Sequence, residues 1–375
     1  MEYARYGKGG PMISRLGFGL MRLPQDKEQE WGSVNYERST EIIRASLAAG
    51  VNFFDSHHRY HLGKSETAFG KAMKGWKGHR VYIQTKTPWY NVEKEAYFKK
   101  FLYEALEKTG VESIDYLLTH ALDMAAWKKR GKGFLRFTDW ALGKGLIQHR
   151  GFSSHDSGEN VKKFIDTGEF SAMLVSYNWM DPRQREVIGY ASSKGMGVSV
   201  MNPLGGGALS TDTPQVMGLL PGAKTSAEIG MRFVLGTPGV VAAVSGMNKL
   251  EQLSENVQIA CQKTTLTAKE SRELQKKLGK INRQAQKFCT RCGYCMPCPA
   301  GVDIPENFGL YNRMQFFGQE GFAKVLYKRL QKHAKGNHSA ESCKKCGRCL
   351  EKCPNEVPII EQLMEVATRV GGAGK

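Results

Sequence analysis

Short apolar runs alternate with stretches of helical periodicity along most of the chain, and this alternation constrains the fold more than any other feature. Each apolar run ends in a polar residue or a turn, as a buried strand does. The intervening stretches have apolar residues at helical spacing, and glycines such as Gly50 and Gly110 follow them as C-caps. The strand-like runs lie at 16–20, 51–55, 81–86, 114–120, 150–154, 172–178, 197–202 and 240–244.

Eight such βα units predict an α/β fold in which the strands close into a parallel (β/α)8 TIM barrel. A doubly wound open sheet is the alternative. It would usually carry a G-x-G-x-x-G fingerprint after its first strand, and the sequence has none there. Before the first barrel strand, glycines and Pro11 lie between short apolar pieces, so we predict a hairpin over residues 3–13.

Three successive predicted strands end in residues that together can donate a proton. Asp55 ends one strand and Tyr60 follows in the loop, Lys86 ends the next strand, and His120 the third. Active sites of TIM barrels lie at these strand ends, so we expect the four side chains to meet. We expect Lys86 to lower the pKa of Tyr60, Asp55 to hold Lys86, and His120 to hydrogen-bond a carbonyl oxygen. Each residue alone is more often structural, but the ordered set favours catalysis.

These four residues resemble the Asp-Tyr-Lys-His tetrad of the aldo-keto reductase family, and the resemblance covers residues 1–260. The flanking motifs that also match lie at 52–54, 65–66, 145–147, 151–155, 245–246 and 255–256. The resemblance implies NAD(P)H-dependent reduction of a small carbonyl substrate. In such a reaction Tyr60 protonates the carbonyl oxygen while hydride reaches the carbon.

The resemblance also implies a binding site for the nicotinamide dinucleotide. Ser153 and Ser154 would contact the carboxamide, residues 246–256 would hold the adenine end, and the loop at Gly205 would assist the pyrophosphate. The residues implied for the cofactor are Gly19, Ser153, Ser154, Met201, Pro203, Leu204, Gly205, Gly246, Asn248, Lys249, Gln252, Glu255 and Asn256.

The sequence departs from the family pattern at several of these positions. The family usually has Asn at the position of Ser154, often Gln at that of Leu174, and in many members an aromatic residue at that of Met201. Around the expected 2′-phosphate site the only basic residue is Lys249, so NADP and NAD both stay open.

Three histidines stand in the loop after Asp55 where smaller residues are common. They are His57, His58 and His61. We weigh three interpretations for them: a metal site, substrate contacts, or a solvated loop.

Eight of the nine cysteines lie in the last quarter of the chain, and only Cys261 stands apart. Such crowding, with no apolar signal peptide at the start, favours metal over disulfides. The eight cysteines form two runs, Cys289-x-x-Cys292-x-x-Cys295-x-x-Cys298-Pro299 and Cys343-x-x-Cys346-x-x-Cys349-x-x-x-Cys353-Pro354. The second run has the spacing of bacterial ferredoxins, and the first run is one residue shorter. Zinc ribbons are the alternative, but they use cysteine pairs rather than triplets.

In two-cluster ferredoxins the fourth cysteine of each run ligates the other cluster. The sequence therefore predicts two 4Fe–4S clusters with crossed ligation. One would be held by Cys289, Cys292, Cys295 and Cys353, and the other by Cys343, Cys346, Cys349 and Cys298.

The domain organisation follows from these patterns. We predict a barrel over 1–262, a helical linker over 263–287 that starts at a capping box, and a ferredoxin-like domain over 288–375. Helical periodicity at 306–317 and 322–333 predicts that this last domain is mainly α-helical. The tail resembles those fused to a subgroup of aldo-keto reductases in anaerobes.

The net charge of +18 bears on partners. Lys and Arg are scattered rather than gathered in a stripe, which argues against nucleic acid. After Cys261 they outnumber Asp and Glu about two to one, so we expect an acidic redox partner such as ferredoxin or flavodoxin. No apolar run is long enough to span a bilayer, so we expect no membrane partner and a cytoplasmic protein.

Two functional hypotheses stay open on this sequence. The first is a reductase with hydride chemistry at Tyr60, coupled to or regulated by the clusters. The second is a ferredoxin-type electron-transfer protein, or a cluster-driven reductase, whose barrel does not use nicotinamide. The intact tetrad favours the first hypothesis.

Overall fold

The structure is a computed structural model that describes residues 1–26, 32–88, 95–207, 209–262, 266–284, 289, 293–317, 320–333 and 336–372. The chain divides into two compact units, which are described separately below. The first comprises Met1–Tyr177, Pro182–Pro203 and Met231–Thr265; the second comprises Asn178–Asp181, Leu204–Gly230 and Leu266–Lys375.

The first unit contains a closed barrel of parallel strands in the order β10-β3-β4-β5-β6-β7-β8-β9. The strands are β3 (Leu16–Gly19), β4 (Phe53–Asp55), β5 (Tyr82–Thr87), β6 (Ile114–Thr119), β7 (Ile147–Ser154), β8 (Ala172–Ser176), β9 (Gly197–Met201) and β10 (Ala242–Ser245). Most are buried on both faces, which explains why they appear in the sequence as continuous apolar runs. The predicted TIM barrel is confirmed.

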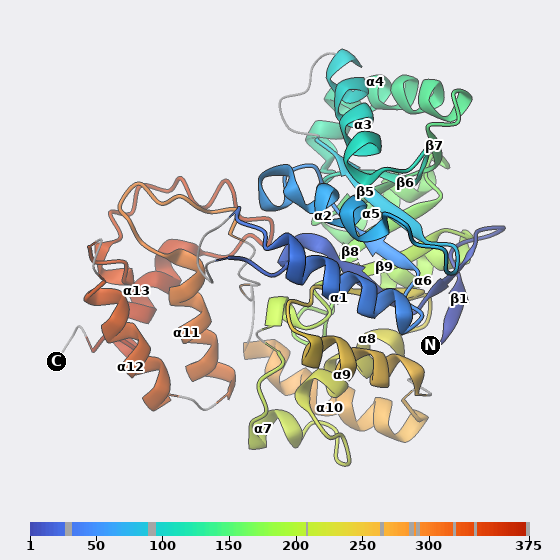
Figure 1. Cartoon of the computed structure of the whole chain (residues 1–375). Helices are drawn as coiled ribbons and strands as arrows, with labels where there is room; N and C mark the ends of the chain where they lie inside the picture. The colour runs from blue at the N-terminus through green and yellow to red at the C-terminus, as the bar shows by residue number, and fades with distance from the viewer. Residues whose placement is uncertain are drawn as a thin grey trace. The chain divides into compact units, whose positions relative to one another are not determined.

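Helices follow the strands and lie outside them (Figure 1). They are α1 (Tyr36–Ala48), α2 (Lys64–Met73), α3 (Glu95–Thr109), α4 (Met124–Gly143), α5 (Gly158–Asp166), α6 (Arg185–Ser193), α8 (Ser226–Leu235) and α9 (Leu250–Cys261). In the sequence, the apolar residues at helical spacing that predict this helix begin only at Phe134, but α4 begins at Met124. The Asp123 side chain caps it by accepting a hydrogen bond from Ala126 N.

The predicted N-terminal hairpin is present as β1 (Tyr3–Arg5) and β2 (Met12–Ser14), which pair antiparallel. Its turn carries Tyr6, which is 1% exposed and packs with barrel residues such as Phe53. The Tyr6 hydroxyl donates to Gln84 Oε1 at 3.0 Å. The hairpin therefore places a polar group in contact with the barrel interior.

The second unit is mainly helical in its described residues. It contains α7 (Pro214–Met217), α10 (Ala268–Gln284), α11 (Ile304–Phe317), α12 (Glu320–Gln331) and α13 (Ile359–Arg369). Helices α11, α12 and α13 group together at the C-terminal end of the colour scale (Figure 1) and share one apolar core. The two helices predicted between the cysteine runs correspond to α11 and α12.

The two cysteine runs lead into the same local structure. Gly301, three residues after Cys298, has φ 77°, and Glu356, three residues after Cys353, has φ 48°. Helices α11 and α13 each begin six residues after the last cysteine of their run. This repeat is visible in the sequence as C-P-x-x-V-x-I.

Among the described residues, no helix is both long and apolar enough to cross a membrane.

Candidate active site

Asp55, Lys86 and Tyr60 meet at the C-terminal ends of β4 and β5. Lys86 Nζ lies 2.7 and 2.6 Å from the two carboxylate oxygens of Asp55, and 3.5 Å from the Tyr60 hydroxyl. A third strong contact joins Lys86 Nζ to Ser56 O at 2.7 Å. All three side chains are buried, with exposed fractions of 2% for Lys86, 3% for Asp55 and 8% for Tyr60. The structure thus brings these residues together as the sequence analysis expected.

His120 follows β6 and is buried beside the same residues. Burial is the largest cause that holds the pKa of His120 well below its ordinary value, and the positive charge of Lys86 acts in the same direction. His120 is therefore a neutral imidazole in this environment. A neutral imidazole offers one N–H donor and one acceptor.

Gln84, which was not predicted as a site residue, orients the Asp55 carboxylate. Its Nε2 donates to Asp55 Oδ1 at 2.8 Å, and its Oε1 accepts from the Tyr6 hydroxyl. Tyr6 is also within 2.9 Å of Ser199 Oγ. Gln84 lies two residues before Lys86 and so faces the same side of β5, a signal that strand periodicity supplies.

The electrostatics of Tyr60 differ from the prediction. Burial raises the pKa of Tyr60 well above its ordinary value, and the Asp55 carboxylate raises it further. The prediction that Lys86 lowers the pKa of Tyr60 is therefore wrong for this state. Both oxygens of Asp55 bind the ammonium and offset part of its effect on the phenol, so desolvation dominates while Tyr60 is protonated.

Two of the three loop histidines are not solvated. His57 and His61 are each 1% exposed. His61 Nε2 accepts from Leu23 N at 3.1 Å, and its Nδ1 lies 3.1 Å from Ser33 O, so this residue holds neighbouring backbone. Within the described part of the chain, no group of three or more His, Cys, Asp or Glu is arranged to hold a single metal ion. The metal interpretation of this loop has no support.

Ser153 and Ser154 lie at the end of β7, but their hydroxyls already have partners. Ser153 Oγ donates to Thr119 O at 3.0 Å, and Ser154 Oγ donates to Leu122 O at 2.6 Å. Each hydroxyl also accepts from a backbone N–H, that of Ala121 and Asp156 respectively. In this structure the two serines hold the loop after β6, and their contact with a carboxamide stays a prediction.

Other residues implied for the cofactor also stand at strand ends. Gly19 is the last residue of β3 and Met201, half-buried, the last of β9, with buried Pro203 two residues on. Leu204 and Gly205 belong to the second unit, where Gly205 begins a turn of three glycines with positive φ. A side chain on these glycines would be strained.

The remaining implied residues surround the start of α9. Those that are exposed or half-buried are Gly246, Asn248, Lys249, Gln252 and Glu255. Buried Asn256 donates to Ser245 Oγ at 3.2 Å and so ties the helix to the end of β10. The N-cap residue of α9 is Lys249, and its side chain makes no capping hydrogen bond. An exposed helix start beside a lysine suits a phosphate.

The described cysteines of both runs gather around one core. Partly buried against the helical core of the second unit are Cys289, Cys295, Cys298, Cys343, Cys349 and Cys353. The electrostatic neighbours of the Cys349 thiol are Cys343, Cys298 and Cys346, which includes a cysteine of the first run. Cys292 lies outside the described residues. No disulfide joins the cysteines that the structure describes.

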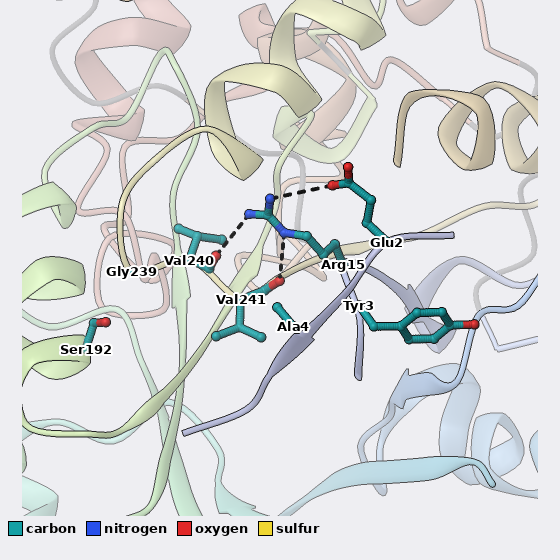
Figure 2. Close-up of a pocket in the computed structure, with 8 residues that line it drawn as sticks. All are labelled: Glu2, Tyr3, Ala4, Arg15, Ser192, Gly239, Val240 and Val241. Atoms are coloured by element: carbon teal, nitrogen blue, oxygen red, sulfur yellow. Dashed lines mark hydrogen bonds and ion pairs between the residues drawn. The ribbon is translucent and has the colours of Figure 1, made fainter. Parts of the chain in front are cut away.

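A separate open cavity of about 420 Å³ lies by the N-terminal hairpin (Figure 2). Arg15 crosses it and donates to Leu235 O and Val240 O at 2.5 and 3.2 Å. Arg15 directly precedes β3, so this cavity is at the end of the barrel opposite the tetrad. Residues at that end usually serve stability rather than catalysis.

Comparisons with known proteins agree with this site. Residues 15–217 match the model of the aldo/keto reductase family, and residues 288–357 match that of the 4Fe-4S dicluster domain. An uncharacterized oxidoreductase of Bacillus subtilis is 20% identical over 308 residues, which cover 73% of this chain and 96% of that protein. An uncharacterized oxidoreductase of Schizosaccharomyces pombe is 23% identical over 269 residues, covering 67% and 83%.

A solved structure shows the same fold. It is the holo form of an aldo-keto reductase from Bacillus halodurans, which superposes with a TM-score of 0.64 at 22% identity. The superposition covers 74% of this chain and 96% of that one.

Proposed function

Because the chain belongs to the aldo/keto reductase family and carries a 4Fe–4S dicluster domain, we propose that it reduces a carbonyl substrate with NADPH or NADH and that Tyr60 donates the proton. The observation that carries the proposal is the buried contact of Lys86 with both Asp55 and Tyr60. A purely structural Asp55–Lys86 ion pair does not require a phenol beside the ammonium. A tyrosine that donates a proton does require a nearby cation to stabilise its phenolate.

The raised pKa of Tyr60 is compatible with this role. Burial keeps the phenol protonated across the neutral range, so the proton is present when it is needed. Hydride addition to a carbonyl leaves an alkoxide, which binds a proton more tightly than a phenolate does. Proton transfer from Tyr60 is therefore downhill. Lys86, at 3.5 Å, then stabilises the phenolate that forms.

The residues around α9 fit the phosphate end of a nicotinamide dinucleotide, since an uncapped helix start there lies beside Lys249. When bound, the nicotinamide supplies the hydride. In the barrel, Asp55, itself oriented by Gln84, holds Lys86. Buried His120 would donate a hydrogen bond to the substrate oxygen. The choice between NADPH and NADH rests on the same lysine, which is the only basic residue in that segment.

We also propose two 4Fe–4S clusters with the crossed ligation predicted from sequence. The proximity of Cys298 to Cys343, Cys346 and Cys349 supports one of the two sets. Each cysteine of such a set would bind a different iron, so the four sulfurs need not lie as close together as around a single ion. In this proposal residues 1–262 form the reductase, 263–287 the linker and 288–375 the cluster domain.

The proposed role of the clusters is to exchange single electrons with an acidic protein carrier. Exposed basic side chains alternate with the cysteines of the second run at Lys344, Lys345, Arg348 and Lys352. If each cluster accepted one electron, the two would together hold the two electrons released when a hydride is oxidised, and its proton would pass to solvent. Opposite charges across such a surface accelerate association.

Anaerobic purification followed by analysis of iron, sulfide, flavin and nicotinamide in one sample tests this proposal. We expect about eight iron atoms per chain, four for each cluster, and saturable binding of NADPH or NADH with reduction of a carbonyl probe. Zinc in place of iron, or iron for a single cluster, would exclude the cluster assignment. Carbonyl reduction by reduced ferredoxin without any nicotinamide would favour the cluster-driven alternative.

A further inference from the structure

His57 packs against two members of the tetrad although no part of the proposed proton transfer uses it. Its ring centroid lies 3.9 Å from that of His120 and 5.2 Å from that of Tyr60. The side chain is 1% exposed. His57 therefore shares the space in which a carbonyl substrate would meet Tyr60.

The hydrogen bonds of His57 define where its proton is. Arg59 N donates to Nδ1 at 3.4 Å, so Nδ1 is an acceptor. Burial, followed by the nearby His120 and His58, depresses the pKa of His57, and the imidazole is neutral. In a neutral imidazole the other nitrogen carries the hydrogen. His57 Nε2 is thus an N–H donor.

This donor has no acceptor among the described residues, although it is completely buried. Of the neighbouring loop histidines, His61 has a partner at both ring nitrogens. His58 bonds to the backbone of Lys86, while its Nδ1 also has no partner among the described residues. A buried donor without an acceptor is unfavourable and rare in native proteins, so a ligand atom is expected at Nε2.

The count of lone pairs indicates which ligand atom this is. A carbonyl oxygen accepts two hydrogen bonds, and in the proposed reaction Tyr60 and His120 supply both. A third donor therefore needs a second oxygen. The close packing of the His57 and His120 rings places that oxygen near the first.

We propose that His57 Nε2 donates a hydrogen bond to a second substrate oxygen adjacent to the carbonyl. The substrate class is then α-oxygenated carbonyl compounds: vicinal dicarbonyls, α-hydroxy carbonyls or 2-oxo acids. This inference rests on the proposed carbonyl reduction and adds a determinant of specificity to it.

The test compares two probes that differ in one oxygen, butane-2,3-dione and butanone. The measured quantity is the ratio of their kcat/KM values in the full-length holoenzyme, so that intrinsic reactivity cancels between variants. His57→Phe should lower the dione-to-ketone ratio about 3- to 10-fold, as loss of one neutral hydrogen bond implies. His57→Gln, which keeps an N–H donor, should restore part of the ratio.

Two control variants separate this inference from the proposed function. Tyr60→Phe should slow both probes and keep their ratio, and His58→Phe should also keep the ratio. An unchanged ratio in His57→Phe overturns the assignment of His57 alone. Equal turnover of both probes in Tyr60→Phe and wild type overturns the proposed function instead.

A binding readout decides the matter even if wild type reduces neither probe. In protein labelled with ¹⁵N-histidine, the His57 resonances are those missing from His57→Phe. We expect the Nε2–H tautomer and a shift of its nitrogen on addition of butane-2,3-dione but not of butanone. A charged ring, the Nδ1–H tautomer, or equal responses to both probes would refute the proposal; a bound water alone at Nε2 would give equal responses.

Discussion

Replacement of Lys86 by Met should destabilise the barrel strongly, because it leaves the Asp55 carboxylate buried without its cation. The ammonium contacts both carboxylate oxygens at 2.7 and 2.6 Å, and Asp55 is 3% exposed. Only the 2.8 Å bond from Gln84 would remain among the side-chain contacts described for Asp55. Removal of one partner of a buried ion pair costs about 3–5 kcal/mol.

The effect can be read from urea unfolding. All six tryptophans lie between Trp31 and Trp179, so none of the fluorescence comes from the cluster-binding tail. With a slope near 3 kcal/mol/M, as for a large domain, the midpoint should fall by about 1–2 M. Carbonyl reduction should fall about 10²–10⁴-fold, since the Tyr60 phenolate loses its stabilising charge.

The double variant Asp55→Asn with Lys86→Met is the matched control. It removes both charges and keeps an acceptor for Gln84, so most of the stability should return. Activity should stay low, because the cation is still absent. If the single and double variants unfold at the same urea concentration, the pair is not a desolvated ion pair and the reasoning fails.

Three further predictions concern the clusters, the partner and the proton donor. Cys353→Ala should damage the cluster of the first cysteine run and spare that of its own run, as anaerobic electron paramagnetic resonance and iron analysis would show. Reversal of charge at Lys344 and Arg348 should weaken binding to an acidic ferredoxin at least severalfold, with the loss shrinking as salt rises. Since burial and the Asp55 carboxylate raise the pKa of Tyr60, kcat for reduction should stay level through neutral pH and fall only above about pH 10.

These three have their own controls. Cys261→Ala removes an exposed cysteine outside both runs and should keep full iron content. Reversal of exposed Lys77 in the first unit should leave partner binding unchanged. Crossed ligation is wrong if Cys353→Ala affects only the cluster of Cys349. A fall in kcat that begins near neutral pH would indicate that an acid other than Tyr60 donates the proton.

The barrel could be predicted from the sequence because its strands are buried on both faces. Runs such as 114–119 are buried throughout and mostly apolar, so their positions can be predicted from the sequence pattern. Helix α4 was placed too late because its first turns, around residues 125–133, are basic and lack an apolar stripe. Its start depends on one cap, Asp123, which periodicity does not detect.

The identities of the site residues could be predicted from the sequence, but their burial and electrostatic surroundings could not. Asp55, Lys86 and Tyr60 were found because strand ends of a barrel converge. The direction of the Tyr60 pKa shift was missed because it depends on burial and on the nearby Asp55 carboxylate, which sequence order does not contain. The burial of His57 was missed for the same reason: a histidine-rich loop reads as polar, yet here it turns inward.

The most direct test of the account is Tyr60→Phe in anaerobically purified protein. Phe keeps the ring and its packing but removes the proton that the proposed reaction uses. We predict that kcat for the carbonyl substrate falls about 10²–10⁴-fold, while nicotinamide binding and iron content stay at the wild-type level. Near-full turnover of the same substrate by Tyr60→Phe would contradict the account and leave the electron-carrier or cluster-driven alternative in its place.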